Sequence, residues 1–244
     1  MEPIFHEIQS LVTTGLIKRN GFHSSIWKEL LLNICSITNP EALIKNVLSS
    51  EEHLDNISKM SYKHINGFDK IVLFNSEKEL FKLRLHIWWP TKTAHFREHI
   101  HNHRWNFATS IILGCYRLET YTRSKEGEPV YSYSYWSPEE WQTYRMVLRG
   151  QTYVKKMLDV DVSKGTIYQL EHSVLHRVTQ LTKSGTVSLV LQGQALKKNT
   201  SVLTDMPVLN PSSMPAKRFS VNKLVNKLEN CVALLGCVNH STDS

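Results

Sequence analysis

The 244-residue sequence lacks the features of an exported or membrane-spanning protein. It has no apolar run long enough to cross a bilayer, and its first residues, MEPIFHEIQS, lack the basic start and apolar core of a signal peptide. Its four cysteines, Cys35, Cys115, Cys231 and Cys237, form no CxxC pair and no disulfide-framework spacing. We therefore expect a cytoplasmic protein with reduced thiols and no membrane contact.

The sequence also lacks an arginine-rich run and a helix-turn-helix pattern. Its formal charge is +7, but lysine and arginine are scattered as short pairs such as Lys18-Arg19 and Lys155-Lys156. A positive balance favours anionic ligands and says nothing about the fold. We expect no nucleic-acid partner.

The spacing of apolar residues changes from helical to strand-like near residue 63. Residues 1–63 predict three or four short helices that cover one side of a sheet. Residues 64–195 contain short strand patterns separated by Gly, Ser and Pro, which predict a mainly β sandwich or barrel. In residues 196–244 we expect no further sheet after Gly193, a Pro- and Ser-rich strap, and a helix over 221–235 that could dock on the barrel or form a homodimer contact.

Histidines gather in two parts of the β-rich region. His99, His101 and His103 occupy every second position, a spacing that turns side chains of an extended strand to one face. His172 and His176 precede a second apolar run. Two histidines from one strand and a third from a distant strand can form a metal site with an open position. A hydrated, histidine-rich surface is the alternative interpretation.

The two histidine motifs resemble those of a known family. IHNH, followed a strand's length later by the Gly of ILGCY, resembles the first cupin motif, and LHRV followed by TVSLVLQ resembles the second. The pattern is most similar to that of the cysteine-dioxygenase-like thiol dioxygenases and covers residues 80 to 193. The resemblance implies a cupin-type double-stranded β-helix, a jelly-roll barrel, in which His101, His103 and His176 hold a ferrous ion.

Other positions depart from the family pattern. Cupins place a Glu after the first motif, but none occurs between His103 and Gly114, and the next is Glu119. The thiol dioxygenases bind cysteine with an upstream Arg, which the segment SYKHINGFDK lacks, and Gln192 stands where their Tyr is expected. The resemblance thus predicts the metal site without the cysteine-specific pocket.

Three neutral imidazoles leave positions on a metal open and add no negative charge, which suits a small anionic substrate bound beside O₂. We expect Fe(II), although Zn, Mn, Ni and Cu bind the same donors. The predicted activity is that of a mononuclear non-haem iron oxygenase, a dioxygenase-like oxidoreductase. The alternatives are a non-oxidative metal-dependent isomerase, epimerase or decarboxylase, and a metal- or ligand-binding protein without turnover.

Five further residues are candidates for the site. Trp105 follows His103 by two positions and could line the substrate pocket, where Gln192 is the second candidate catalytic residue. His99 and His172 could orient the metal ligands or supply an extra one. Arg84 could bind a substrate carboxylate if it points inward, but its position beside Lys82 favours the surface.

Overall fold

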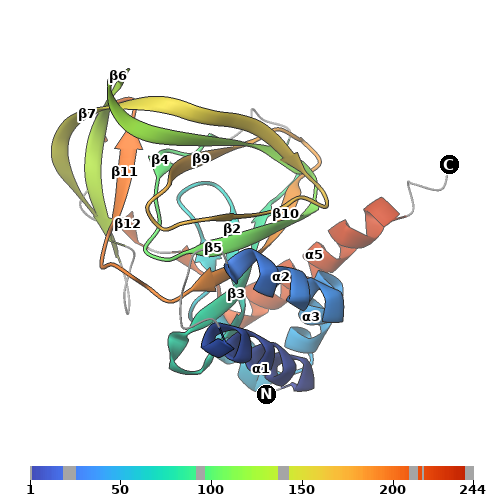
Figure 1. The fold of residues 1–244 in the computed structure, drawn as a ribbon. Coiled ribbons are helices and arrows are strands. Elements are labelled where there is room, and N and C mark those ends of the chain that lie inside the picture. The colour runs from blue at the N-terminus through green and yellow to red at the C-terminus, as the bar shows by residue number, and fades with distance from the viewer. Residues whose placement is uncertain are drawn as a thin grey trace.

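The computed structural model describes residues 2–18, 26–91, 97–136, 143–208, 214–215 and 217–239. Two antiparallel sheets face each other, and helices lie against one of them (Figure 1). The helices are α1 (Pro3–Lys18), α2 (Ile26–Ile37), α3 (Pro40–Leu48), α4 (Glu51–Ser58), the short η1 (Glu77–Glu79) and α5 (Val221–Asn239). The strands are β1 (Tyr62–Lys63), β2 (Asp69–Asn75), β3 (Phe81–Trp88), β4 (Ile100–His101), β5 (Phe107–Leu113), β6 (Cys115–Trp136), β7 (Thr143–Ser163), β8 (Ile167–Leu170), β9 (Leu175–Gln180), β10 (Thr186–Gly193), β11 (Thr200–Thr204), β12 (Met214–Pro215) and β13 (Lys217–Arg218).

Eight strands, β3 to β10, pair in a nested order. β3 pairs with β10, β4 with β9, β5 with β8 and β6 with β7, all antiparallel. They form the adjacent runs β3-β10-β5-β8 in one sheet, here called sheet A, and β4-β9-β6-β7 in the other, sheet B. This is the strand order of a jelly roll, and it confirms the predicted mainly β, cupin-type double-stranded β-helix. The nesting places β4 beside β9, although they lie far apart in the chain.

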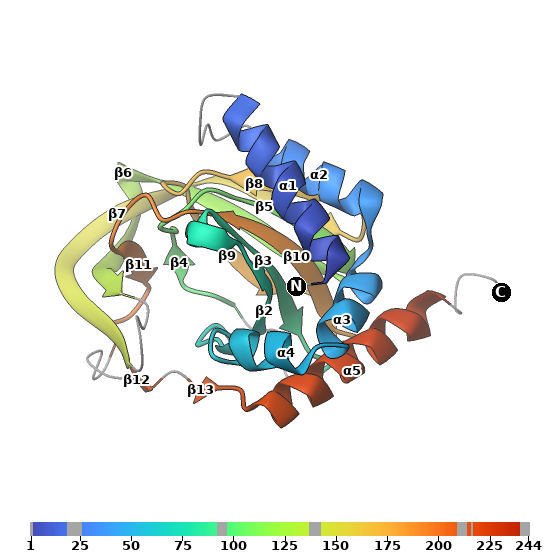
Figure 2. The same ribbon diagram turned by 90° about the horizontal axis from the view of Figure 1, so that it is seen from below.

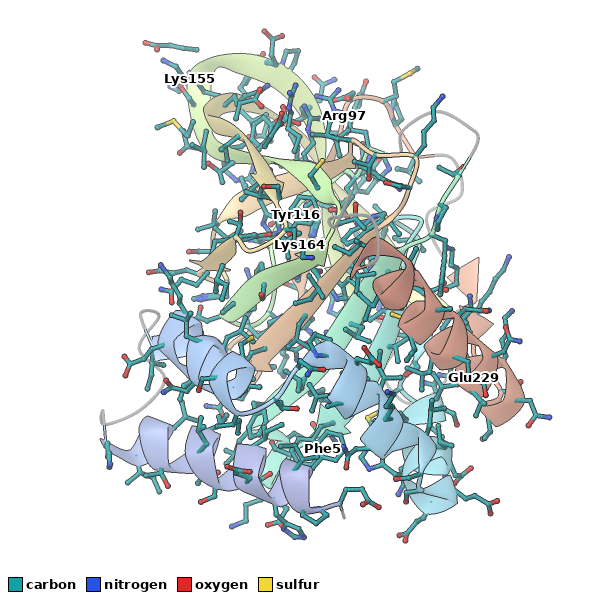
Figure 3. The ribbon with its side chains drawn as sticks, turned by 90° about the vertical axis from the view of Figure 1, so that its right-hand side faces the viewer. Phe5, Arg97, Tyr116, Lys155, Lys164 and Glu229 are labelled. Carbon is teal, nitrogen blue, oxygen red and sulfur yellow. The ribbon has the colours of Figure 1, made fainter. Side chains whose placement is uncertain are left out.

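The main hydrophobic core lies outside the barrel, between sheet A and the helices. On β3 and β10 the apolar side chains of one face, including Leu85 and Leu189, pack with Phe5 of α1, Trp27 of α2 and Leu224 of α5. Seen from below, these helices lie on one side of the molecule and the β6–β7 hairpin curves away on the other (Figure 2). Figure 3 shows Phe5 and Lys155 of β7 at opposite ends. The opposite faces of β3 and β10 are left to line the barrel interior.

The helices agree with the sequence patterns. Asn39 caps α3, with its Oδ1 accepting a hydrogen bond from the Ala42 backbone N–H at 2.9 Å, and Ser50 caps α4 in the same way. The helix expected over 221–235 is α5, which packs against α3 and α4. Within the described part of the chain, no helix has the length and apolarity needed to span a membrane. The division at residues 63 and 195 stays a prediction.

Two expectations about the strands are wrong. Sheet structure does not end at Gly193, because β11 pairs with β4 and β6 in sheet B. The Pro- and Gly-containing residues before Val130 do not separate two strands either. β6 runs through them, and a register shift between Arg123 and Glu128 accommodates the irregularity. The long hairpin of β6 and β7 results.

A buried carboxylate fastens α5 to the sheet, and its removal should destabilise the protein. Asp69 of β2 is fully buried; it accepts a hydrogen bond of 2.5 Å from Trp89 Nε1 and forms an ion pair with Lys227 of α5. Asp69→Asn should lower the free energy of unfolding by about 3 kcal/mol, because it leaves a partly buried ammonium group without its counter-charge. Urea denaturation measures the change.

The matched control for this prediction is Asp55→Asn. Asp55 forms an exposed ion pair with Lys59 one helical turn away, at 2.6 Å. Its replacement should change the free energy of unfolding by less than about 0.5 kcal/mol. Equal effects of the two substitutions would contradict the role given to Asp69.

Candidate metal centre and its cavities

Three histidine rings converge inside the barrel. His101 ends β4, His103 follows it in the β4–β5 connection, and His176 is the second residue of β9. One ring nitrogen from each of the three lies within 4.8 Å of the others. His101 and His176 are direct neighbours in the β4–β9 register, with ring centroids 4.7 Å apart. The nested strand order therefore brings together the two histidine motifs of the sequence.

Backbone carbonyls fix the orientation of two of these rings. His101 Nδ1 lies 2.9 Å from the carbonyl oxygen of His99, and His176 Nδ1 lies 3.0 Å from that of Val174. A carbonyl can only accept, so each Nδ1 carries the proton and donates it. Each Nε2 then carries no proton, and its free lone pair can bind a metal ion. The residues present therefore fit a divalent ion held by three imidazoles.

Burial keeps the three rings neutral. It lowers the pKa of His176 to about 3, with a smaller contribution from the charge of His101. Burial also lowers the pKa of His101 and brings the pKa of His103 well below its usual range. At neutral pH the rings need not lose a proton to bind a cation.

Two cavities adjoin the histidine group. The outer cavity has a volume of about 90 Å³ and the inner cavity a volume of about 50 Å³, counted as the space open to the centre of a water molecule. On the same measure a single water molecule needs about 10–15 Å³. The outer cavity thus has room for a small organic molecule. Both cavities are lined by His101, His103 and Trp105, and the Trp105 ring stacks on that of His103 at 5.3 Å.

Cationic side chains surround Trp105. The guanidinium carbons of Arg84 and Arg104 lie 5.2 and 5.5 Å from the centre of its ring, and Lys70 Nζ lies 5.8 Å away. The expectation of a surface position for Arg84 is wrong: it is buried and lines both cavities. Both faces of β3 are covered in this fold, so a charged side chain does not mark the solvent side.

Of the other candidate residues, only His99 lines one of the two cavities. His99 is exposed and lines the outer cavity. The backbone N–H of His172 donates to Asn106 Oδ1 at 2.8 Å, and its ring nitrogen Nδ1 lies 3.1 Å from the same oxygen. Gln192 is buried on β10, opposite Phe107 and Lys82 in the register, and its Oε1 has no hydrogen-bond partner among the described residues. The functional roles of these three residues stay predictions.

Two glutamates, Glu119 and Glu98, do not occupy the position that the cupin pattern gives to its glutamate. Glu119 lies away from the histidine group, because it pairs with Arg177, whose side chain leaves β9 on the face opposite to His176. Glu98 lines the inner cavity, with Oε2 4.0 Å from His101 Nδ1. Burial raises the pKa of Glu98 to about 8, so the group is mainly protonated at neutral pH. It was missed in the sequence because it precedes the first motif, where the family pattern has no carboxylate.

The inner cavity contains a second polar group that sequence patterns did not indicate. The hydroxyls of Tyr116 on β6 and Tyr168 on β8 lie 2.6 Å apart. Both residues line this cavity together with Glu98 and Ser188. In the segments that the structure describes, Ser188 Oγ has no hydrogen-bond partner. The four come from separate segments, so no spacing in the sequence connects them.

Comparison with known proteins finds no match in sequence and only weak similarity in structure. No family model and no curated protein matches the sequence. Among solved structures, the chain is similar to an RmlC-like cupin from Shewanella frigidimarina, with 9% identity, a TM-score of 0.34, and coverage of 55% of this chain and 83% of the other. It is also similar to a hydroquinone 1,2-dioxygenase in complex with Cd²⁺ and 4-hydroxybenzonitrile, with 15% identity, a TM-score of 0.33 and coverage of 52% and 64%.

A third similar structure is a variant of oxalate decarboxylase from Bacillus subtilis. The identity is 12% and the TM-score 0.34, over 55% of this chain. The matched part spans only 27% of the decarboxylase chain.

Proposed function

We propose that the protein is a mononuclear non-haem iron oxygenase of the cupin type that acts on a small anionic substrate and O₂, with a site similar to that of the thiol dioxygenases. One observation carries the proposal: three neutral imidazoles from β4, the β4–β5 connection and β9 converge within 4.8 Å. His101, His103 and His176 would hold the ion. When bound, Fe(II) supplies a Lewis-acidic, redox-active centre for reaction with O₂.

The surrounding residues support an anionic substrate in a sheltered site. Arg84 places positive charge in the outer cavity, beside the histidine group, and the amine of Lys70 lies close to the same Trp105 ring. Trp105 and Phe107 pack on His103, with ring centroids 5.3 and 4.8 Å away, and exclude water from that side of the imidazole. In this proposal the protein binds, orients and shields the substrate, and Gln192 replaces the tyrosine of the cysteine enzymes.

The cysteines agree with a cytoplasmic location in this proposal. Within the described residues, Cys35, Cys115 and Cys231 are free thiols. Burial raises the pKa of Cys231 to about 12, which keeps it protonated and unreactive. A reducing compartment would preserve this state and would also favour iron in its ferrous form.

Metal analysis combined with oxygen consumption tests the proposed function. Protein purified from its native host should contain one iron per chain. The anaerobically Fe(II)-loaded protein should consume O₂ only when a substrate from a panel of thiols, enols and carboxylates is added. His103→Ala should remove both the iron and the O₂ uptake.

Other results would replace the proposal by one of its alternatives. Zn, Mn or Ni in the native protein, together with turnover under strict anaerobiosis, would indicate a non-oxidative isomerase, epimerase or decarboxylase. Bound metal without turnover of any panel member would indicate a binding protein. A native protein without metal, and without affinity for Fe(II), would refute the metal site.

A further inference from the structure

The outer cavity has two chemically different walls. Sheet A contributes the cationic one: Lys70 on β2 and Arg84 on β3 lie on the same face and both approach the ring of Trp105. Sheet B contributes the apolar one: Tyr135 on β6, Met146 on β7 and Val202 on β11 pack in one cluster. A ligand that bridges the two walls must have a charged end and an apolar end.

The cationic wall has unused capacity to bind an anion. Arg84 is only 6% exposed, yet within the described part of the chain its Nε has no hydrogen-bond partner. Lys70 Nζ donates a hydrogen bond to the hydroxyl of Tyr62 at 2.8 Å. Burial, together with the charge of Arg84, lowers the pKa of Lys70 well below its usual range. Buried cations without a counter-ion are costly, and a bound anion would offset that cost.

The described lining of the outer cavity offers no carboxylate to an ammonium group. Among the described residues that line it, none is an aspartate or a glutamate. Glu98 lines the inner cavity and not the outer one. The ammonium group of an amino acid bound in the outer cavity would therefore lie near Arg84 and Lys70 and would find no carboxylate there to balance its charge.

We propose that the outer cavity binds a small carboxylate whose remaining part is apolar and carries no amino group. The carboxylate lies at Arg84 and Lys70, and the apolar part packs between Trp105 and the cluster of Met146 and Val202. A guanidinium group favours a carboxylate because two of its N–H groups can bind both oxygens. The inference rests on the proposed function only in naming this ligand as the substrate. Binding itself requires no metal.

Four probes of similar shape test the charge requirement. Metal-free, full-length protein is titrated calorimetrically with phenylacetate, phenylacetamide, phenethylamine and L-phenylalanine, which are an anion, a neutral amide, a cation and a zwitterion. Phenylacetate should bind at least about 10-fold more tightly than each of the other three probes. The amide loses the charged hydrogen bond, and the amine and the amino acid add an ammonium group that the cationic wall repels. Phenethylamine or L-phenylalanine binding as tightly as phenylacetate would overturn the proposal, as would failure of phenylacetate to bind at millimolar concentration.

Variants test the assignment to Arg84 and Lys70. Arg84→Gln and Lys70→Gln should each weaken phenylacetate binding about 10-fold or more, while phenylacetamide binding stays within about 3-fold. Arg84→Lys should restore part of the loss. Lys155→Gln is the matched control, because Lys155 is exposed on the β6–β7 hairpin, away from the cavity. Circular dichroism shows whether each variant folds. If Arg84→Gln does not fold, the Arg84→Lys and Lys70→Gln variants still test the assignment.

The two proposals fail in different ways. If phenylacetate binds with the predicted selectivity but the native protein contains no metal, the binding site stands and the oxygenase function falls. If iron is present and O₂ is consumed only with an amino acid or an uncharged substrate, the oxygenase function stands and the carboxylate specificity falls.

Discussion

Replacing His176 with alanine is expected to abolish stoichiometric metal binding. Each of the three converging rings supplies one donor nitrogen, and His176 is the only one that comes from β9. Changes to residues that merely orient a ligand cost about 10- to 100-fold in affinity, so loss of a ligand should raise the dissociation constant for Co²⁺ more than about 100-fold. Titration of metal-free protein with Co²⁺, followed by its visible absorption, measures the change.

Further substitutions separate metal ligation from other effects of losing a histidine. His103→Ala should give the same loss of affinity at a ring that is less deeply buried, and so serves if His176→Ala folds poorly. His6→Ala is the matched control, since His6 lies on the exposed face of α1. Folded His176→Ala and His103→Ala proteins that bind Co²⁺ as tightly as the wild type would disprove the assignment of the site.

Gly114→Ala is expected to cause a large loss of stability, although it adds only one methyl group. Gly114 joins β5 to β6 with a φ of +73°, a conformation that costs other residues about 1–2 kcal/mol. An added Cβ would also lie 2.3 Å from the carbonyl oxygen of Gly185, so the strands must move apart. Together these effects should lower the free energy of unfolding by about 3 kcal/mol or more.

The matched control for Gly114 has the opposite expected sign. Gly236 lies in α5, and a Cβ built there meets no heavy atom within 4 Å. Gly236→Ala should raise the free energy of unfolding by up to about 1 kcal/mol, because alanine loses less backbone entropy in a helix. Urea denaturation of the two variants tests both signs, and destabilisation of less than about 1 kcal/mol by Gly114→Ala would contradict the expectation.

The histidine group could be predicted because its signals are local. His101 and His103 lie within one short motif and His176 within another, so each motif can be recognised without knowing the pairing of strands. The position of Gly114 after an apolar run likewise marked the end of β5. The capped helices α3 and α4 follow from Asn39 and Ser50 for the same reason: a cap acts on N–H groups only two or three residues away.

The cavity could not be predicted because its signals are non-local. On β3, Leu85 and Arg84 face opposite sides of sheet A, and alternation alone does not say which side is the barrel interior. Helices cover one face of sheet A and sheet B faces the other, so the usual rule that polar residues face solvent fails for Arg84. β11 was missed because Val202 owes its place in sheet B to pairing with His101 and Tyr133, which are remote in sequence.

Stability and ligand choice lie on opposite sides of the same strands. Leu189 and Leu191 of β10 pack beneath the helices, whereas Ser188 and Val190 of the same strand line the inner cavity. A substitution at Ser188 or Val190 therefore changes what the barrel can accept without creating a void under α1, α2 or α5. This separation makes the scaffold evolvable: successive mutations inside the barrel can redirect it to new ligands while the helical layer continues to hold it folded.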